Sequence, residues 1–349
     1  MFTPAPFDPA RPGLLLPGRL DELGITGPTR SQSQGKHVRR TSRGFYLPAW
    51  VAPEPAAQRI VEASVVVPPG CAITGWAALH WYGARWFSGT AADGSLLPVT
   101  VAISTRDIRP QYGIEVSGEG LNPRCIEWVD GLPVTCATYA TSFLMRYAPS
   151  LRHAVAYLDM AAYSDLVSIA EQRDFLTPGQ NGWTGVPQAR LAVELAAENA
   201  WSPQEVFMRL VWIIDAGLLR PLCNAPIFDL AGRHLATPDL IDPVTGVMGE
   251  YDGDGHLTRD QRHLDVKREG LLRGHGLESV IMLAPDLRDP RDYLRRLAEA
   301  RRRATARPVA ERTWTLEAPS WWTSTATVDQ RRALTADQRR RFLGYRLVG

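Results

Sequence analysis

The stretch that decides the fold is Thr237-Pro-Asp-Leu-Ile-Asp-Pro-Val-Thr-Gly-Val-Met-Gly-Glu-Tyr-Asp-Gly-Asp-Gly-His256. Asp242-Pro243 and Gly246 are typical turn residues, and apolar residues flank the turn on both sides. If Asp242 pairs with Val247 across the turn, Asp239 falls directly opposite Glu250. Because side chains alternate along a strand, Glu250 and Asp252 then share one face of the sheet.

Carboxylates gathered on one face of a sheet suggest a binding site for a divalent metal ion. Directly opposed like charges destabilise a sheet unless water or a hard cation lies between them. Mg²⁺ prefers oxygen ligands, and a bound divalent ion polarises a phosphodiester and lowers the pKa of a bound water. We therefore expect a Mg²⁺ or Mn²⁺ site at Asp239, Glu250 and Asp252, with His256 as a nearby proton acceptor.

The elements around this stretch predict an α/β domain over residues 200–305. Ser202-Pro203-Gln204-Glu205 has the residues of a helix start, and Gly217 is a natural end for that helix. Three strands, a helix, a strand and a final helix should follow, over residues 222–229, 234–241, 247–252, 258–273, 278–283 and 290–303.

The rest of the chain divides into an N-terminal region, 1–199, and a tail, 306–349. Residues 14–90 and 91–199 form the two parts of the first region. Its expected helices cover 19–24, 56–63, 74–83, 138–147, a segment opened by Ser150, and 187–197; its strands lie near 97–103, 114–116 and 134–135. The tail carries two capping-box patterns, at 327–330 and 335–338, which predict short helices. The whole chain is thus α/β, or α+β overall.

Composition limits the class of protein. The chain has 349 residues, 45% hydrophobic and 22% charged, with a formal net charge of +2. Its four cysteines form no Cys-x-x-Cys pair, and no stretch of about 18 apolar residues or signal-peptide pattern is present. We therefore expect a cytoplasmic protein with reduced thiols. Arginine supplies nearly all the positive charge, and its runs at 295–303 and 331–341 fit either phosphate recognition or solvated helix faces.

On these residues the C-terminal domain resembles the PD-(D/E)XK nucleases related to very-short-patch repair endonucleases. The resemblance implies a restriction-endonuclease-like fold in which Glu205, Asp239 and Glu250 gather the metal and Arg268 contacts the scissile phosphate. Asp265 and Asp286 also fit the pattern. Asp252 stands where the general motif has lysine, so that the water-activating role moves to His256 or activity is lost.

The N-terminal half resembles the AbiEi-type antitoxins of actinobacteria. Arg43-Gly-Phe-Tyr-Leu-Pro48, Ile73-Thr-Gly-Trp-Ala-Ala-Leu-His-Trp-Tyr-Gly83 and Gly131-Leu-Pro-Val-Thr-Cys-Ala-Thr138 carry this likeness. It implies a winged-helix-like DNA-binding unit, although the helix normally expected before the Arg43–Pro48 segment is poorly defined here.

Plainer interpretations remain beside these. Glu205 could cap a helix without binding metal, and Asp252 and Asp254 could be solvated turn residues. Residues 250–261 imitate a calcium-binding loop, but Gln261 stands where such a loop needs a bidentate carboxylate. Trp314, Trp321 and Trp322 in the tail favour packing over base stacking.

Two functions follow as hypotheses. The first is a Mg²⁺-dependent DNA endonuclease, acting in phage defence or DNA repair. The alternative is a non-catalytic antitoxin or transcriptional regulator that uses a degenerate nuclease fold to bind DNA or a partner. The expected partners are DNA and either a toxin or a second copy of the chain, with no membrane.

Overall fold

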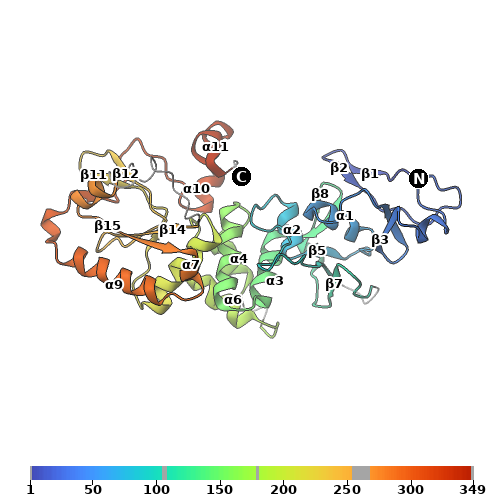
Figure 1. Cartoon of the computed structure of the whole chain (residues 1–349), viewed down its shortest axis with the longest axis horizontal. Coiled ribbons are helices and arrows are strands. Elements are labelled where there is room, and N and C mark those ends of the chain that lie inside the picture. The colour runs from blue at the N-terminus through green and yellow to red at the C-terminus, as the bar shows by residue number, and fades with distance from the viewer. Residues whose placement is uncertain (1, 104–107, 178–180, 254–267, 347–349) are drawn as a thin grey trace. The chain divides into compact units, whose positions relative to one another are not determined.

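The computed structural model describes residues 2–103, 108–177, 181–253 and 268–346, and it confirms a mixed α/β protein (Figure 1). The chain forms two compact units. The first contains Met1–Ala148 and Glu171–Val186, and the second contains Pro149–Ala170 and Pro187–Gly349. None of the helices in the described ranges has the length and apolar content needed to cross a bilayer.

The first unit is built around a five-stranded sheet in the order β7-β6-β5-β9-β8, accompanied by two hairpins. Its sheet strands are β5 (Ala72–Thr74), β6 (Val99–Ala102), β7 (Ile114–Ser117), β8 (Ile126–Val129) and β9 (Leu132–Thr135). The hairpins are β1 (Pro6–Asp8) with β2 (Arg11–Leu15) and β3 (Val38–Ser42) with β4 (Phe45–Pro48). Its helices are α1 (Ala56–Ser64), α2 (Trp76–Trp81), α3 (Ala137–Tyr147) and α5 (Ile169–Phe175). The expected helices at 56–63, 74–83 and 138–147 are confirmed.

The expected helix at residues 19–24 is wrong. Here the Asp21 carboxylate accepts hydrogen bonds from the backbone N–H groups of Leu23, Ile25 and Thr26, and these bonds lower its pKa to about 2. Such local bonds offer the backbone an alternative to a helix. Among the described residues 2–37, the helical structure is a short 3₁₀ turn, Gln32–Gln34, which precedes the β3–β4 hairpin.

The second unit contains a four-stranded sheet in the order β10-β13-β14-β15 and a three-stranded sheet in the order β12-β11-β16. The expected strands at 222–229 and 234–241 are each divided between the two sheets. The first becomes β10 (Leu222–Cys223) and β11 (Ile227–Asp229), and the second becomes β12 (His234–Ala236) and β13 (Leu240–Ile241). Pro226 and Pro238 stand at the two breaks, and Asn224 adopts a left-handed φ of 46° at the first.

The remaining strands and the helices that cover them lie close to the residue ranges predicted from the sequence. β14 (Val247–Asp252) and β15 (Glu278–Leu283) pair in parallel, and α9 (Arg291–Thr305) packs on them. α7 (Pro203–Leu210) begins at Ser202 as expected and ends in a wider π turn, Val211–Asp215, before Gly217. Met208, Trp212, Val280 and Tyr293 are buried together between these helices and the sheet.

The second unit also takes in α4 (Leu151–Tyr163) and α6 (Val186–Leu195), which we had placed in the N-terminal region. α4 packs against α7, and a fully buried ion pair joins Asp159 of α4 to Arg209 of α7. The expected division near residue 200 therefore does not coincide with the compact units, because these contacts bind residues 149–170 to the C-terminal part of the chain.

The tail folds onto the second unit rather than forming a separate body. Trp314 in β16 (Trp314–Thr315) is 5% exposed, which confirms its packing role. Both predicted capping boxes are present, at the starts of α10 (Val328–Arg332) and α11 (Ala336–Leu343). The four cysteines are unbridged, as expected.

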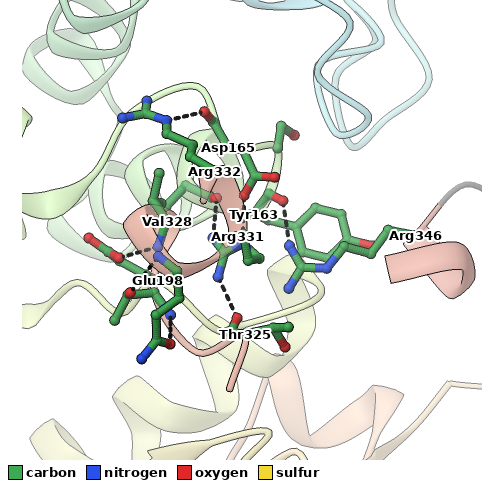
Figure 2. Close-up of polar contacts among 12 residues, drawn as sticks. Tyr163, Asp165, Glu198, Thr325, Val328, Arg331, Arg332 and Arg346 are labelled. Atoms are coloured by element: carbon green, nitrogen blue, oxygen red, sulfur yellow. Dashed lines mark hydrogen bonds and ion pairs between the residues drawn. The ribbon is translucent and has the colours of Figure 1, made fainter. Parts of the chain in front are cut away.

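Figure 2 shows Arg331, Arg332 and Arg346 holding the tail at the end of α4, and with Arg339 they form what we call the arginine clasp. Arg331 is fully buried, pairs with Asp165 at 2.5 Å and donates to the carbonyl groups of Ala162 and Thr325. Arg332, Arg339 and Arg346 bind Asp165, Leu166 and Tyr163. The arginines of the clasp thus bind carbonyl groups at the end of α4 and in the loop that follows it, where cationic side chains are favoured.

Candidate active site

The β13–β14 hairpin brings two acidic residues face to face. Leu240 pairs with Gly249 and Ile241 with Met248, and the Asp242 N–H donates to the Val247 carbonyl at 2.9 Å. The next pair in this antiparallel register is Asp239 with Glu250. The predicted register is therefore confirmed, and it rests on the turn at Asp242-Pro243.

Asp239 is partly buried at the corner where β12 turns into β13. Its Oδ2 accepts the Tyr251 N–H at 2.7 Å, and its own carbonyl accepts the Asn224 N–H at 3.0 Å. Burial, together with the charge of Glu250, raises the pKa of Asp239 from 3.8 to about 6, although the Tyr251 N–H lowers it. The carboxyl is therefore held by a backbone hydrogen bond and lies within the electrostatic influence of Glu250.

Glu205 reaches the same place from α7. Its backbone N–H donates to the N-cap Ser202 at 3.2 Å, while its Oε2 accepts from the Trp201 N–H at 2.8 Å and from the Asn224 amide at 2.7 Å. It is 7% exposed, and burial together with the charge of Asp239 raises its pKa to about 7. The helix-capping role is thus present, and ligation of a metal remains a prediction for the same side chain.

A close approach beneath Glu250 explains why residue 249 is glycine. A Cβ built there would lie 3.1 Å from Trp212 Cζ3, 3.3 Å from the Tyr293 hydroxyl and 3.4 Å from Leu240 Cβ. The indole and phenol rings therefore pack directly under the strand that carries the acidic residues. This support belongs to the buried core of the second unit.

A cavity of about 330 Å³ opens at the carboxyl end of β14. Glu250, Asp252, Arg268 and Ser279 are among its lining residues. The Arg268 guanidinium lies 3.8 Å from the Glu250 carboxylate, and both side chains are partly exposed. The structure thus places Glu250, Asp252 and Arg268 around one opening, with Asp239 opposite Glu250.

Other predicted residues fall outside this group. His256 and Asp265 lie outside the described residues, as does most of the calcium-loop imitation. Asp286 is buried, accepts the Leu283 N–H at 2.8 Å and pairs with Arg296 at 2.6 Å. It closes the turn after β15 and pairs with Arg296 of α9, which indicates a structural role.

Sequence reasoning missed His234. Its ring lies in β12, five residues before Asp239, with Nε2 2.9 Å from the Thr237 hydroxyl. Burial and the charge of Arg268 lower its pKa, which favours the neutral ring at pH 7. The available signal was Pro238, which separates β12 from β13 and leaves His234 on a different strand from Asp239.

Most arginines of the run at 295–303 form internal ion pairs, a role that differs from both phosphate recognition and a solvated helix face. Arg296, Arg301 and Arg303 pair with the buried carboxylates of Asp286, Asp242 and Glu278. Arg295, in contrast, is 62% exposed and pairs only within its own helix. Most of this run therefore fastens α9 to the sheet, because buried carboxylates need partners.

The donor set fits a cation held by few protein ligands. Within the described ranges, no three His, Cys, Asp or Glu side chains are grouped closely enough to hold an ion together. Mg²⁺ is usually bound by one or two carboxylates, with water and substrate phosphate completing its shell. Asp239 and Glu250 supply that number of carboxylates, so the residues present fit such an ion.

No family model, curated protein or solved structure matches this chain. What the protein does must therefore be inferred from its own residues and their geometry.

Proposed function

We propose that the protein is a Mg²⁺- or Mn²⁺-dependent DNA endonuclease whose centre is the pair Asp239 and Glu250. The observation that carries the proposal is that Asp239 lies opposite Glu250 in the β13–β14 register, while burial and then an acidic neighbour raise the pKa of both Asp239 and Glu205. Like charges brought together in a partly buried place cost stability, and such arrangements are concentrated at functional sites.

In this proposal, different residues of the site bind the metal ion, orient its ligands and adjust the local charge. Asp239 and Glu250 would hold the ion from two adjacent strands, and the Tyr251 N–H would keep the Asp239 carboxyl oriented. When bound, the ion would polarise the phosphodiester and lower the pKa of a bound water. Glu205 of α7, whose carboxylate accepts a hydrogen bond from the Asn224 amide, would add negative charge near Asp239.

The cavity beside Glu250 would receive the phosphate. Arg268 lies there and would exchange its ion pair with Glu250 for contact with the scissile phosphate, since a guanidinium binds phosphate oxygens well. Asp252 lines the same cavity and would join as a further ligand. The role of proton acceptor stays assigned to His256.

This proposal agrees with the resemblance of residues 200–305 to very-short-patch-repair-like PD-(D/E)XK nucleases. The likeness of the first half to AbiEi-type antitoxins would give the first unit a DNA-binding role. A role in phage defence or DNA repair follows from these resemblances alone.

A second candidate is a non-catalytic regulator that binds DNA or a partner through the same fold. Asp252 in place of the usual lysine favours it, and so does the use of the α9 arginines in internal ion pairs. In this case the acidic residues would be remnants of an ancestral centre.

A cleavage assay on plasmid and branched DNA with Mg²⁺, Mn²⁺ or EDTA tests the proposal. Metal-supported catalysis contributes several kcal/mol, so Glu250→Gln should slow nicking by about 10²- to 10⁴-fold. Glu269→Gln is the matched control, because Glu269 lines the same cavity but pairs with Arg273 on its own helix. Equal nicking by wild type and Glu250→Gln would remove this centre from the reaction, and a wild type that cuts no DNA form would favour the regulator.

A further inference from the structure

The tail forms a second cavity, separate from the one beside Glu250. It measures about 400 Å³, within the usual range for small-molecule sites. Trp321, Trp322 and Phe342 provide its aromatic lining, and Gln338 and Arg341 provide polar groups. Gln338, Arg341 and Phe342 come from one face of α11, so a regular element fixes their spacing.

The tryptophans of the tail differ in their exposure to solvent. Trp314 is 5% exposed in the core, whereas Trp321 is 60% exposed at the cavity. Trp321 and Trp322 meet edge to face, with ring centroids 5.6 Å apart and planes at 70°. A large aromatic face is therefore left open to solvent where the cavity opens, although another indole of the same tail is buried.

The polar side of the cavity offers both donors and acceptors in defined positions. The Gln338 carbonyl oxygen accepts the Thr335 N–H at 2.9 Å, which orients the amide group. The Arg341 guanidinium lies over the Phe342 ring at 5.3 Å. Flat aromatic surfaces beside an amide and a guanidinium match the chemistry of a nucleobase, which presents two faces and a hydrogen-bonding edge.

One ring contact, followed by electrostatic interactions, leads from this cavity towards the acidic centre. Trp322 stacks on His234, with ring centroids 5.4 Å apart and planes at 20°. His234 lies within the electrostatic influence of Arg268, and Arg268 lies 3.8 Å from Glu250. All of these residues belong to the second unit.

We propose that this cavity receives one unpaired nucleobase of a DNA strand, stacked on Trp321 and contacted at its edge by Gln338 or Arg341. The inference rests on the proposed function for its choice of DNA. It deepens that function by specifying the substrate, which would be DNA with a single-stranded end, gap or mismatch rather than an intact duplex. A continuous duplex keeps its bases paired and stacked, so it offers no base to the cavity.

The test is a binding titration in EDTA, where no cleavage occurs, with the full chain and fluorescently labelled DNA. Stacking of a base on an aromatic side chain corresponds to about a 5- to 100-fold change in Kd. Trp321→Ala should weaken binding of an overhang or single strand by this factor and leave a blunt duplex unchanged within about twofold. Trp128→Ala is the control, because Trp128 is 75% exposed on β8, in the other unit.

Two conservative variants separate stacking from general packing. Trp321→Phe should keep most of the affinity because a flat ring remains, whereas Trp321→Leu should lose it although its side chain is also apolar. Thermal melting of each variant shows whether the fold is kept. Equal affinities for Phe and Leu variants would contradict stacking, as would a Trp321→Ala protein that binds overhangs like wild type.

Further outcomes identify the occupant and keep the two proposals apart. Binding of deoxyadenosine monophosphate that depends on Trp321, without binding of any oligonucleotide, would overturn the assignment to a strand. If the wild type binds no DNA, the inference also falls. Trp321-dependent binding without nicking would refute the nuclease alone, and normal nicking with Trp321-independent binding would refute the cavity alone.

Discussion

The acidic centre and the arginine clasp differ in the charges that surround their carboxylates: the clasp provides opposite charges, and the acidic centre provides like charges. In the clasp, the carboxylate of Asp165 pairs with Arg331 and Arg339. Arg332 and Arg346 donate hydrogen bonds to nearby backbone carbonyl groups (Figure 2). In the acidic centre, Asp239 lies opposite Glu250 and its charge influences Glu205, while the Arg268 guanidinium lies 3.8 Å from the Glu250 carboxylate.

The difference separates charges that hold the fold from charges that require another explanation. A buried charge with a good opposite partner is compatible with a stable native state, and removing that partner is costly. A carboxylate whose pKa is raised by burial and by a neighbouring carboxylate opposes folding in its charged form, and such groups are concentrated where a ligand or a reaction uses them. The comparison therefore indicates a structural role for the clasp, and it supports the proposal that the acidic centre is a functional site.

The largest effect should come from breaking the clasp. Arg331→Ala leaves the Asp165 carboxylate and two carbonyl groups without their buried partner, so we expect a loss of about 3–5 kcal/mol in the free energy of unfolding. Denaturant unfolding followed by tryptophan fluorescence measures it. Arg340→Ala, in an exposed pair with Asp337, should change stability by less than about 0.5 kcal/mol. Equal effects from both variants would show that the clasp contributes little.

The arginine run of α9 provides a contrast within one helix. Glu278 is 3% exposed and pairs with Arg303 at 2.8 Å, so Arg303→Ala should cost about 1–3 kcal/mol by leaving a buried carboxylate without its partner. Arg295→Ala should be nearly neutral, because that side chain is exposed. A neutral Arg303→Ala would return this run to the phosphate-binding role first considered for it.

In the acidic centre, removing a charged side chain should raise the free energy of unfolding instead of lowering it. In EDTA at pH 7.5, Asp239→Asn should stabilise the protein by roughly 1 kcal/mol, because it removes a carboxylate whose pKa is raised from 3.8 to about 6. Between these two pH values the folded state binds the proton more tightly than the unfolded chain, so wild-type stability falls as pH rises. The difference between variant and wild type should therefore shrink below pH 4. A variant less stable than wild type at pH 7.5 would show that the Tyr251 hydrogen bond outweighs the repulsion.

The sequence predicted the parts of the site that depend on local pattern. The turn at Asp242-Pro243 and the alternation along β14 placed Asp239 opposite Glu250, and the cap at Ser202 placed Glu205 at the start of α7. Both signals act over a few residues, so they can be found without knowing the rest of the fold.

Contacts between distant segments could not be predicted in the same way. Arg331 finds Asp165 across 166 residues, and Trp322 meets His234 only because the tail returns to β11. Pro226 and Pro238 signalled breaks in two strands, but not that the halves would join different sheets. Side-chain pairing of the arginines likewise depends on which carboxylates the fold buries nearby.

The most direct test of the central claim, that Asp239 and Glu250 form a metal centre, is the melting temperature with and without millimolar Mn²⁺ at pH 7.5. A ligand at 100 times its Kd stabilises the native state by about 2.7 kcal/mol, which corresponds to a rise of roughly 5–10 °C for a unit of this size. We predict this rise for wild type, a smaller one at pH 5.5, where Asp239 and Glu205 hold their protons, and none for Asp239→Asn. An equal rise in wild type and Asp239→Asn would place the ion elsewhere and contradict the account.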